Sequence, residues 1–217
     1  MQRLLASCLV GVAVLSGPAA QAHEVYGQVG TEGLGIGYGY SFSTFGNVRA
    51  EFNGFSISHS FTSGGQRYDG KLNLAHAGLY LDFFPAPTVV PFRLTAGVLL
   101  GGDNIDATAS SMSGTYTING VPYSTNGETV RARADFPTAR PYIGIGFGHT
   151  PTAKKGFSMF FDAGVAYGRP DVTLNVPADI VAEAGQANVD AEEQQLQHQA
   201  DRLRFYPIVK IGVSYRF

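Results

Sequence analysis

Seven charged residues are the first candidates for chemistry, because they stand singly among apolar, small and polar neighbours in segments of alternating hydrophobicity. They are Arg49, Glu51, Asp82, Arg93, Asp162, Lys210 and Arg216. Charges in an apolar setting are costly unless they are paired, and four cations with three anions could nearly neutralise one another. Two interpretations follow. The charges line a passage that selects zwitterionic or cationic solutes, or they form a salt-bridged plug, which a sheet closed around a narrow interior would favour.

Catalytic and metal sites are only weakly indicated. The five histidines, His23, His59, His76, His149 and His198, lie in different segments, and no two have metal-ligand spacing. His59 lies between Ser58 and Ser60, which is similar to the histidine and serine of outer-membrane lipid A deacylases, but a nucleophile also needs an oriented base and a third group. His76 is predicted to face inward as a hydrogen-bonded interior residue. We therefore expect no enzyme, no cofactor and no metal.

Glycine is abundant, with 28 residues in the chain, and its spacing could serve either nucleotide binding or space in the interior of a sheet. The spacing Gly33-x-Gly35-x-Gly37-x-Gly39 differs from the dinucleotide-binding pattern, and no helix follows it to hold a phosphate. Glycines on the inward face of strands instead leave room in the interior, which supports the passage over the plug. They are Gly35, Gly37, Gly39, Gly97, Gly144, Gly146, Gly148, Gly164 and Gly212.

The elements that carry these residues are strands. From Phe92 to Gly101, large apolar residues alternate with Arg93, Thr95 and glycine, and the same period of two recurs in several other segments, including the last one, 209–217. Outside the N-terminus, no apolar run approaches the roughly 20 residues of a membrane-spanning helix. The net charge of −2 shows no excess of basic residues of the kind that indicates nucleic-acid binding.

The second face of each strand decides the class of protein. That face carries glycine, serine and isolated charges, whereas a soluble sandwich would carry many lysines and glutamates. Charged residues make up 15% of the chain, against roughly 25% in an ordinary soluble domain. Apolar residues outside, small or polar residues inside and aromatic residues near the strand ends are typical of an outer-membrane barrel, which is a sheet without unpaired backbone in lipid. The fold class is therefore all-β, an antiparallel transmembrane β-barrel.

The alternation predicts eight strands, and the connections alternate between short and long. The strands cover residues 25–31, 34–43, 48–58, 71–84, 91–104, 138–149, 156–168 and 204–217. Short connections at 44–47, 85–90 and 150–155 would face the periplasm, because bacterial barrels have short periplasmic turns. The external connections would be the tight Thr31-Glu32-Gly33, the segment 59–70 and two long loops at 105–137 and 169–203. Both termini then lie in the periplasm.

The two long loops have predicted structure of their own. Residues 115–123 centre on Asn119-Gly120, the strongest short signal for a hairpin. Residues 178–203 are rich in Ala, Glu and Gln and predict a surface helix, with Val189, Leu196 and Leu203 repeating every seven residues. Such loops could bind partners at the cell surface. Asp103 and Asp106 with the acidic helix could also hold a divalent cation that bridges lipopolysaccharide.

The N-terminus is predicted to be a signal peptide. Arg3 supplies the positive charge, residues 4–15 are apolar, and Ala20-Gln21-Ala22 has the small-x-small cleavage pattern. The domains are therefore a signal peptide, 1–22, and a barrel, 23–217. Cys8 is the only cysteine and lies at the start of the apolar stretch, whereas a lipid-attachment cysteine must follow it. The mature chain then has no thiol chemistry.

The C-terminal strand resembles the signal that the outer-membrane assembly machinery reads. Val213, Tyr215 and the terminal Phe217 share one face of this strand. A strand that happens to end in phenylalanine is the alternative. The resemblance implies the barrel-assembly machinery as a transient partner, in addition to outer-membrane lipid and lipopolysaccharide. We expect a monomer, because small barrels close without a partner.

A family resemblance adds to these expectations. Residues 30–35, 49–54, 141–148 and 213–217 resemble small proteobacterial outer-membrane barrels, and Ile118-Asn119-Gly120 with the acidic helix before Tyr206-Pro207 is similar to the carbapenem-associated proteins described as ornithine-uptake porins. The resemblance implies passive passage of small polar solutes, including basic amino acids. The second candidate function is that of a non-conducting structural or surface-interaction barrel that acts through its external loops. The third candidate function is that of an outer-membrane lipid-modifying enzyme.

Overall fold

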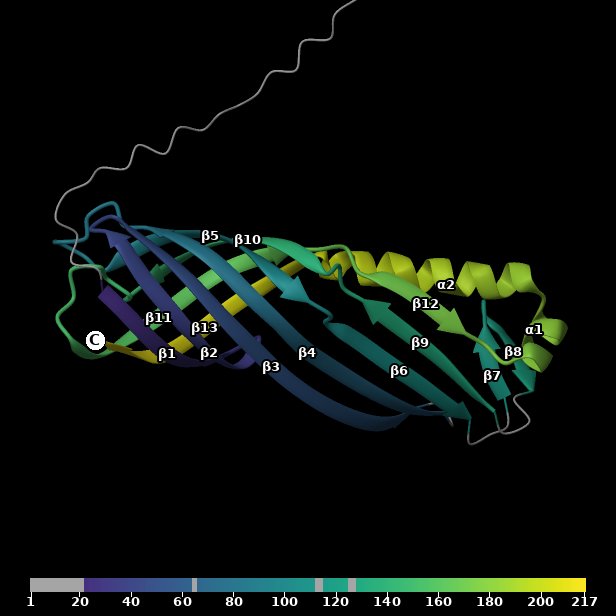
Figure 1. Cartoon of the computed structure of the whole chain (residues 1–217). Coiled ribbons are helices and arrows are strands. Elements are labelled where there is room, and N and C mark those ends of the chain that lie inside the picture. Colours follow the sequence, from purple (N-terminus) through teal and green to yellow (C-terminus); the bar gives the residue numbers. More distant parts are fainter. Residues whose placement is uncertain (1–21, 64–65, 112–114, 125–127) are drawn as a thin grey trace, which may run out of the picture.

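The computed structural model describes residues 22–63, 66–111, 115–124 and 128–217. The predicted signal peptide, apart from Ala22, and Cys8 lie outside these residues. The chain is dominated by one large antiparallel sheet, part of which is rolled up (Figure 1). No helix in the described residues is long and apolar enough to cross a membrane.

The rolled part of the sheet closes on itself. Its strands are β1 (Ala22–Gly30), β2 (Gly33–Ser43), β3 (Gly46–Ser63), β4 (Gln66–Phe83), β5 (Phe92–Gly101), β10 (Ala139–Phe147), β11 (Gly156–Tyr167) and β13 (Phe205–Arg216). Each pairs antiparallel with the next in this order, and β13 pairs back onto β1 with Val25 opposite Tyr215. This ring therefore has no free edge.

The two faces of the ring differ as the alternation predicts. Large apolar side chains are exposed on its outside, with Ile36 at 72% and Phe157 at 81% relative exposure. Inward residues are mostly charged, polar, aromatic or glycine, and a few, such as Leu99 and Ile208, are aliphatic. The ring therefore presents an apolar belt to its surroundings and a polar interior, which is the reverse of a soluble protein.

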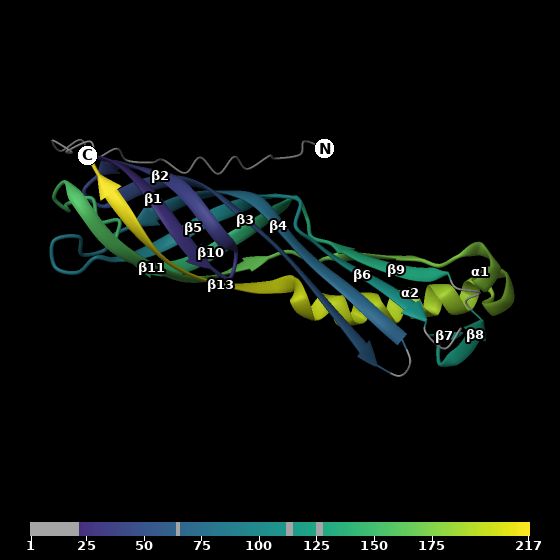
Figure 2. The same cartoon turned by 90° about the horizontal axis from the view of Figure 1, so that it is seen from below.

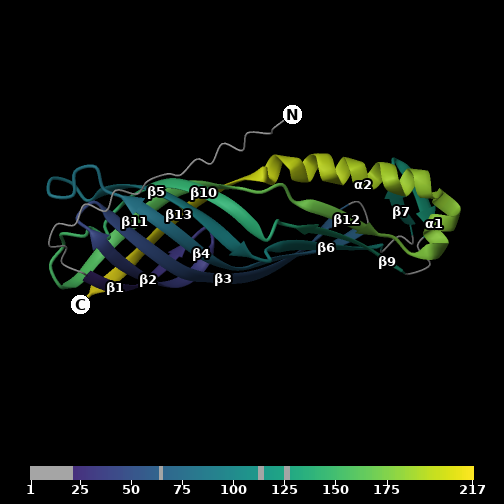
Figure 3. The ribbon, with the colours of Figure 1, turned by 45° about the horizontal axis from the view of Figure 1, so that its top comes forward.

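Beyond the ring, the sheet continues as an extension that we call the arm. β3 and β4 pair from Gly46–Phe83 to Ser63–Gln66, far past the last β2–β3 pair at Gly54. The outer half of β4 pairs with β6 (Asn104–Ser111), which pairs with β9 (Thr129–Asp135), which pairs with β12 (Asp171–Asn175). Figures 2 and 3 show that the arm projects from the end of the ring opposite the C-terminus.

The predicted hairpin and helix complete the arm. The hairpin is β7 (Thr115–Ile118) and β8 (Val121–Ser124), and its turn residues Asn119 and Gly120 have φ of 47° and 80°. The helical segment is α1 (Ala178–Ala184), α2 (Gln186–Ala200) and the 3-10 turn η1 (Asp201–Arg204). Gly185, with φ of 83°, separates the first two, because that backbone conformation ends a right-handed helix.

The arm has its own hydrophobic core. It consists of Ile118, Val130, Leu174, Ile180, Ala184 and Val189. Leu196 packs against this cluster, but Leu203, the third residue of the predicted heptad, is 46% exposed. Because α1 and α2 together with the hairpin cover this core, the arm is a folded unit.

Two predictions about connections were wrong, and a third, the helix, is confirmed with one interruption. Within the segment 59–70, residues 59–63 and 66–70 are strand rather than loop, since they continue the β3–β4 ladder. The predicted loops 105–137 and 169–203 contain β6, β9 and β12, which extend the sheet. The predicted helix 178–203 is interrupted at Gly185. β6, β9 and β12 are short strands of mostly small and polar residues, and they lack a clear apolar alternation that would predict them. They form strands because the outer half of β4 offers an edge on which β6, then β9 and then β12 can pair.

Candidate functional site

The seven charged residues predicted to face inward all lie in the interior of the ring, and none is more than 5% exposed. Arg49 and Glu51 come from β3, Asp82 from β4 and Arg93 from β5. Asp162 comes from β11, and Lys210 and Arg216 come from β13. Inward alternation on five strands thus directs them into one narrow volume.

Four of them form a compact ionic centre. Arg49 binds Asp82 through two hydrogen bonds, Nε to Oδ2 at 2.6 Å and Nη2 to Oδ1 at 3.1 Å. Arg93 donates to Asp162 through Nη2, and its Nε lies 3.5 Å from Asp82 Oδ1. Thr95 also donates to Asp82, at 2.7 Å. Each guanidinium therefore lies near both carboxylates, so the centre is a network rather than two separate pairs.

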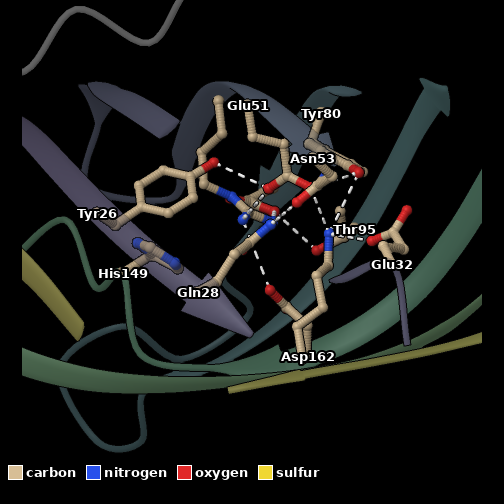
Figure 4. Close-up of polar contacts among 12 residues, drawn as sticks. Tyr26, Gln28, Glu32, Glu51, Asn53, Tyr80, Thr95, His149 and Asp162 are labelled. Atoms are coloured by element: carbon tan, nitrogen blue, oxygen red, sulfur yellow. Dashed lines mark hydrogen bonds and ion pairs between the residues drawn. The ribbon is translucent and has the colours of Figure 1, made fainter. Parts of the chain in front are cut away.

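Glu51 joins this centre to Lys210. Its Oε1 lies 2.6 Å from Lys210 Nζ and accepts a hydrogen bond from Tyr80 at 2.9 Å, while Oε2 accepts one from Tyr26 at 3.1 Å (Figure 4). Asn53 donates to Oε1 at 2.8 Å. A buried carboxylate is stable only when its oxygens are satisfied, and here four side chains satisfy them.

The network continues toward the arm through residues outside the seven predicted charges. Lys210 Nζ lies 3.1 Å from Oε2 of Glu32, which sits in the β1–β2 turn and folds back inside. Glu32 Oε1 contacts His76 Nε2 at 2.8 Å, and Asp103 contacts His76 Nδ1 at 3.0 Å and also pairs with Arg140. His76 is buried as predicted. Because both ring nitrogens face carboxylates, the imidazolium form satisfies both.

A third group of contacts lies toward the opposite end of the ring. His149 Nδ1 lies 2.5 Å from Glu24, and Arg216 Nη2 lies 3.5 Å from the other oxygen of Glu24. Arg216 also donates to the carbonyl oxygen of Pro151 at 2.7 Å. Glu24 was not predicted as an inward residue, because β1 begins at Ala22, three residues before the predicted start of this strand. His149 was not predicted as an inward residue, because it follows the regular part of the strand and has a positive φ of 54°.

Charge is balanced within the buried set. Among the described residues, the buried acids are Glu24, Glu32, Glu51, Asp82, Asp103 and Asp162, and the buried Lys and Arg are Arg49, Arg93, Arg140, Lys210 and Arg216. These six anions and five cations, together with the His76 imidazolium, sum to zero. A neutral network is the arrangement that a low-dielectric interior tolerates.

The inward glycines do not leave open space. A Cβ on Gly37 would lie 2.2 Å from the Tyr26 ring, and one on Gly164 would lie 2.4 Å from the Tyr142 hydroxyl. Gly97 and Gly212 are crowded in the same way by Tyr80 and Phe160, respectively. These glycines make room for aromatic rings, so the idea that they keep the interior open was wrong.

The rings also contact the cations. The guanidinium carbon of Arg49 lies 5.1 Å from the centre of the Tyr80 ring, and Lys210 Nζ lies 4.7 Å from the same centre. Tyr80 and Tyr142 meet edge to face at 5.3 Å. Aromatic faces stabilise desolvated cations, so these rings support the ionic centre.

The alternative sites do not assemble. His59 is on the same face of β3 as Phe55 and Ile57, whereas Ser58 and Ser60 point to the other face, since neighbours on a strand alternate. Asp103 is buried against His76 and Arg140, and Asp106 pairs with Arg133, so the predicted cation site with the acidic helix was wrong. Within the described ranges, no group of three or more His, Cys, Asp or Glu could hold a metal ion.

The predicted assembly segment lies on the outside of the ring. Val213, Tyr215 and Phe217 are each between 43% and 48% exposed. Tyr215 contacts Phe157 of β11, with ring centres 4.9 Å apart, and Phe217 stacks near His23. The three residues therefore form part of the aromatic border of the apolar belt.

Comparison with solved structures identifies the fold. Acinetobacter baumannii CarO is 21% identical with a TM-score of 0.57, covering 89% of this chain and 97% of that one. CarO2 of the same organism is also 21% identical with a TM-score of 0.60, covering 91% and 99%. This chain shares their fold. A major outer membrane protein of Thermus thermophilus is a weaker likeness, with 11% identity, a TM-score of 0.44 and coverage of 91% and 100%.

The fold is thus that of a small outer-membrane β-barrel, as the strand alternation predicts. No family model matches the chain, and no curated protein matches it by sequence. At 21% identity, the likeness to CarO extends to the fold alone. The buried network must therefore be interpreted from its own geometry.

Proposed function

We propose that this protein is an outer-membrane barrel of eight strands whose interior is closed by the ionic network and whose arm serves as a binding platform at the cell surface. The observation that carries the proposal is the burial of the network. Arg49, Glu51, Arg93 and Asp162 would border any water path, yet each is at most 5% exposed and is engaged by its neighbours. Breaking one buried pair costs about 3–5 kcal/mol.

The arm supports the second half of the proposal. A transmembrane strand needs about 9–11 residues, and β3 and β4 have 18 each. The residues beyond Gly54 therefore stand outside the apolar belt, where they carry a folded unit rather than mobile loops. Binding residues concentrate on segments that a rigid scaffold presents to solvent.

The termini and the C-terminal strand complete the topology. We place both termini in the periplasm and the arm outside, because the connections at the terminus end of the ring are the short ones. Thr173→Cys on the arm should then react with an impermeant maleimide on intact cells, while Thr44→Cys at the other end should not. Phe217→Ala should lower the heat-modifiable fraction in outer membranes if the assembly machinery reads this residue.

Passage of small polar solutes is the competing function, and a bilayer experiment separates the two. Folded, heat-modifiable protein in planar bilayers should give no discrete openings. Openings that ornithine or arginine attenuates would overturn the closed barrel and establish a selective passage instead. Arg93→Ala or Asp162→Ala should in that case shift the ion selectivity.

A further inference from the structure

A groove separates α2 from the sheet at the ring end of the arm. Its volume is about 700 Å3, and most of the residues that line it are apolar. The floor comes from β6, β9 and β12, and the wall comes from the end of α2 and from η1. Figure 3 shows α2 lying alongside the sheet over this stretch. Ligand pockets have volumes of roughly 300–1,000 Å3 and mostly apolar linings, so the groove has the dimensions of a binding site.

The groove exists because the side chains between α2 and the sheet become smaller toward the ring. At the tip, Val130 of β9 and Val189 of α2 belong to the arm core. The next two residues on the same face of β9 are Ala132 and Ala134, and α2 ends in Ala200. The helix cannot close onto these alanines, because two of its side chains accept hydrogen bonds from the backbone of β12.

The backbone of the floor has its hydrogen bonds within the sheet. β6 pairs with β4 and β9, and β9 pairs with β6 and β12. A peptide in the groove would lose hydrogen bonds to water and find few partners at the floor, which costs free energy. An alkyl chain has no such groups and would contact the apolar side chains of Ile105, Val172 and Leu196. The groove therefore suits an alkyl chain rather than a peptide.

The ring end of the groove carries a positive charge. Arg202 of η1 lines the groove and is exposed. Its neighbour Asp201 is paired with Arg169 at 2.7 Å, and in the ranges that the structure describes no carboxylate lies within 4.0 Å of the Arg202 guanidinium. A guanidinium can bind a carboxylate through two parallel hydrogen bonds. The groove thus combines an apolar slot with a site for an anion at one end.

We propose that this groove binds a fatty acid, with the carboxylate at Arg202 and the alkyl chain extended over Ala134 and Ala132 toward the arm core. Such a ligand matches both the apolar lining and the charge at the ring end. The inference rests on the proposed external position of the arm, and it assigns a ligand class to the proposed binding platform.

The ligand comes from the medium rather than from the membrane. Leu79, on the lipid-facing wall of β4, is 48% exposed, and Lys71 lies further along β4 on the same face. Lys71 pairs with Asp106, which pairs with Arg133, so the face of the arm that continues this wall is polar. The groove lies on the opposite face. Membrane lipids therefore meet the polar face, and the groove opens to the aqueous side.

Protection of a cysteine from alkylation tests the proposal. Ala107→Cys places a thiol on the floor of the groove, and Thr108→Cys places one on the other face of the same strand. Protein from outer membranes is transferred to phosphatidylcholine nanodiscs, which leave both sides of the membrane accessible. Laurate below its micelle concentration should slow maleimide labelling of Ala107→Cys several-fold and leave Thr108→Cys unchanged. Butyrate, which has the carboxylate without the long chain, should protect neither.

Two further variants, each made with Ala107→Cys as the reporter, test the two parts of the site. Arg202→Ala should raise the half-protecting concentration of laurate about tenfold, as expected for one lost charge-assisted contact. Arg131→Ala is the matched control, because it removes an equally exposed charge from the other face of the sheet. Ala134→Leu should abolish the protection, because the larger side chain takes the place of the alkyl chain.

Each contrary outcome overturns a stated part of the proposal. Equal protection of both cysteines, or full protection in Ala134→Leu, shows that laurate binds elsewhere. Equal effects of Arg202→Ala and Arg131→Ala overturn the position of the carboxylate. Protection of Ala107→Cys by phosphatidylglycerol nanodiscs without laurate makes a membrane lipid the occupant and overturns uptake from the medium.

The proposed function is tested separately. The nanodisc experiment does not depend on which side of the membrane the arm occupies, so its failure leaves the external arm in place. Failure of Thr173→Cys to label on intact cells overturns the external arm, and with it the proposed function. Heat-modifiable migration shows that the barrel of each variant has folded, and hydrogen exchange of α2 shows that the arm has folded.

Discussion

Arg93 illustrates how one residue is held within the buried network. It is fully buried, donates to Asp162 and to the carbonyl oxygen of Gly148, and lies 3.5 Å from Asp82. A guanidinium suits this position because its planar array of donors serves several acceptors at once, which a lysine cannot do. The charge of Arg93 is thus as much a part of the packing as its volume.

Arg93→Ala should be strongly destabilising. It leaves Asp162 and Asp82 with excess buried negative charge, so we expect the free energy of unfolding in detergent to fall by about 3–5 kcal/mol. Urea titration followed by gel mobility and circular dichroism measures this. Arg133→Ala, which removes the exposed pairs to Asp106 and Asp135, should change it by at most about 1 kcal/mol. Equal effects would contradict the role of burial.

Gly164→Ala should also be destabilising, because the interior is filled at this position. The new Cβ would lie 2.4 Å from the Tyr142 hydroxyl and 2.5 Å from the carbonyl oxygen of Ile143. Such overpacking costs about 1–3 kcal/mol. Gly102→Ala, with nothing within 4 Å, is the matched control and should change stability by about 0.5 kcal/mol or less. An unchanged midpoint for Gly164→Ala would indicate an interior with free space.

Among the elements, the hairpin and α2 hold the arm together. The backbone N–H of Asn119 donates to Glu192 Oε2 at 2.9 Å, and its side-chain amide donates to Asn188 Oδ1 at 3.0 Å. The turn of the β7–β8 hairpin is therefore fixed on the helix. Tyr116, on β7, packs against the arm core beside Glu192.

Tyr116 makes the arm sensitive to alkaline pH. Burial, with help from the Glu192 carboxylate, raises the pKa of Tyr116 to about 12, compared with about 10 in an unfolded chain. Below the lower value the phenol is neutral in both states, and its contribution is fully present. As the pH rises through the window between the two values, the unfolded arm ionises first, so stability is lost.

The difference in tyrosinate absorbance between wild type and Tyr116→Phe measures this titration. We expect the wild-type group to ionise near a pH of about 12 and the variant to lose less arm stability across the window. If the Tyr116 signal appears near the unfolded value, about 10, the phenol is not packed into the arm.

The whole molecule consists of a closed ring and an arm with edges. In the part of the chain that the structure describes, every ring strand has two ring neighbours, whereas β12, β7 and β8 each pair with one strand. The arm core is also small, and it is separate from the ring interior, where Leu99, Ala166 and Ile208 pack with Tyr80 and Tyr142. Local opening is easiest where few buried contacts hold the backbone.

Hydrogen exchange should therefore occur in two blocks. Amides of β7, β8 and α1 should exchange well before those of β1, β2 and β13, because opening the ring exposes the charge network. Exchange followed by mass spectrometry on folded protein in detergent measures this. A single uniform rate would contradict the division between ring and arm.

The strands of the ring could be predicted from sequence because their alternation is strong and local. Phe92 to Gly101 shows a full period-two pattern, and Asn119-Gly120 specifies its hairpin by backbone conformation alone. The same alternation places the seven charged residues on the inward face of their strands. Glu32 and His149 could not be found in this way, because they lie in a turn and just past a strand end, where the alternation no longer applies. Asp103 and Arg140 continue the inward alternation of Arg93 and Tyr142, although neither was among the seven predicted residues.

The sequence by itself determined an all-β chain with an apolar outside, a charged inside and long connecting segments that fold. Only the tertiary structure decided that aromatic rings occupy the space beside the inward glycines and that the long segments extend the sheet. The physical reason is the same in both cases. A glycine leaves empty space or accommodates a tyrosine ring according to which residue lies beside it. A polar segment forms a loop or a strand according to whether a strand edge is available for pairing. In both cases the neighbour is brought there by the closure of the ring and is distant in sequence.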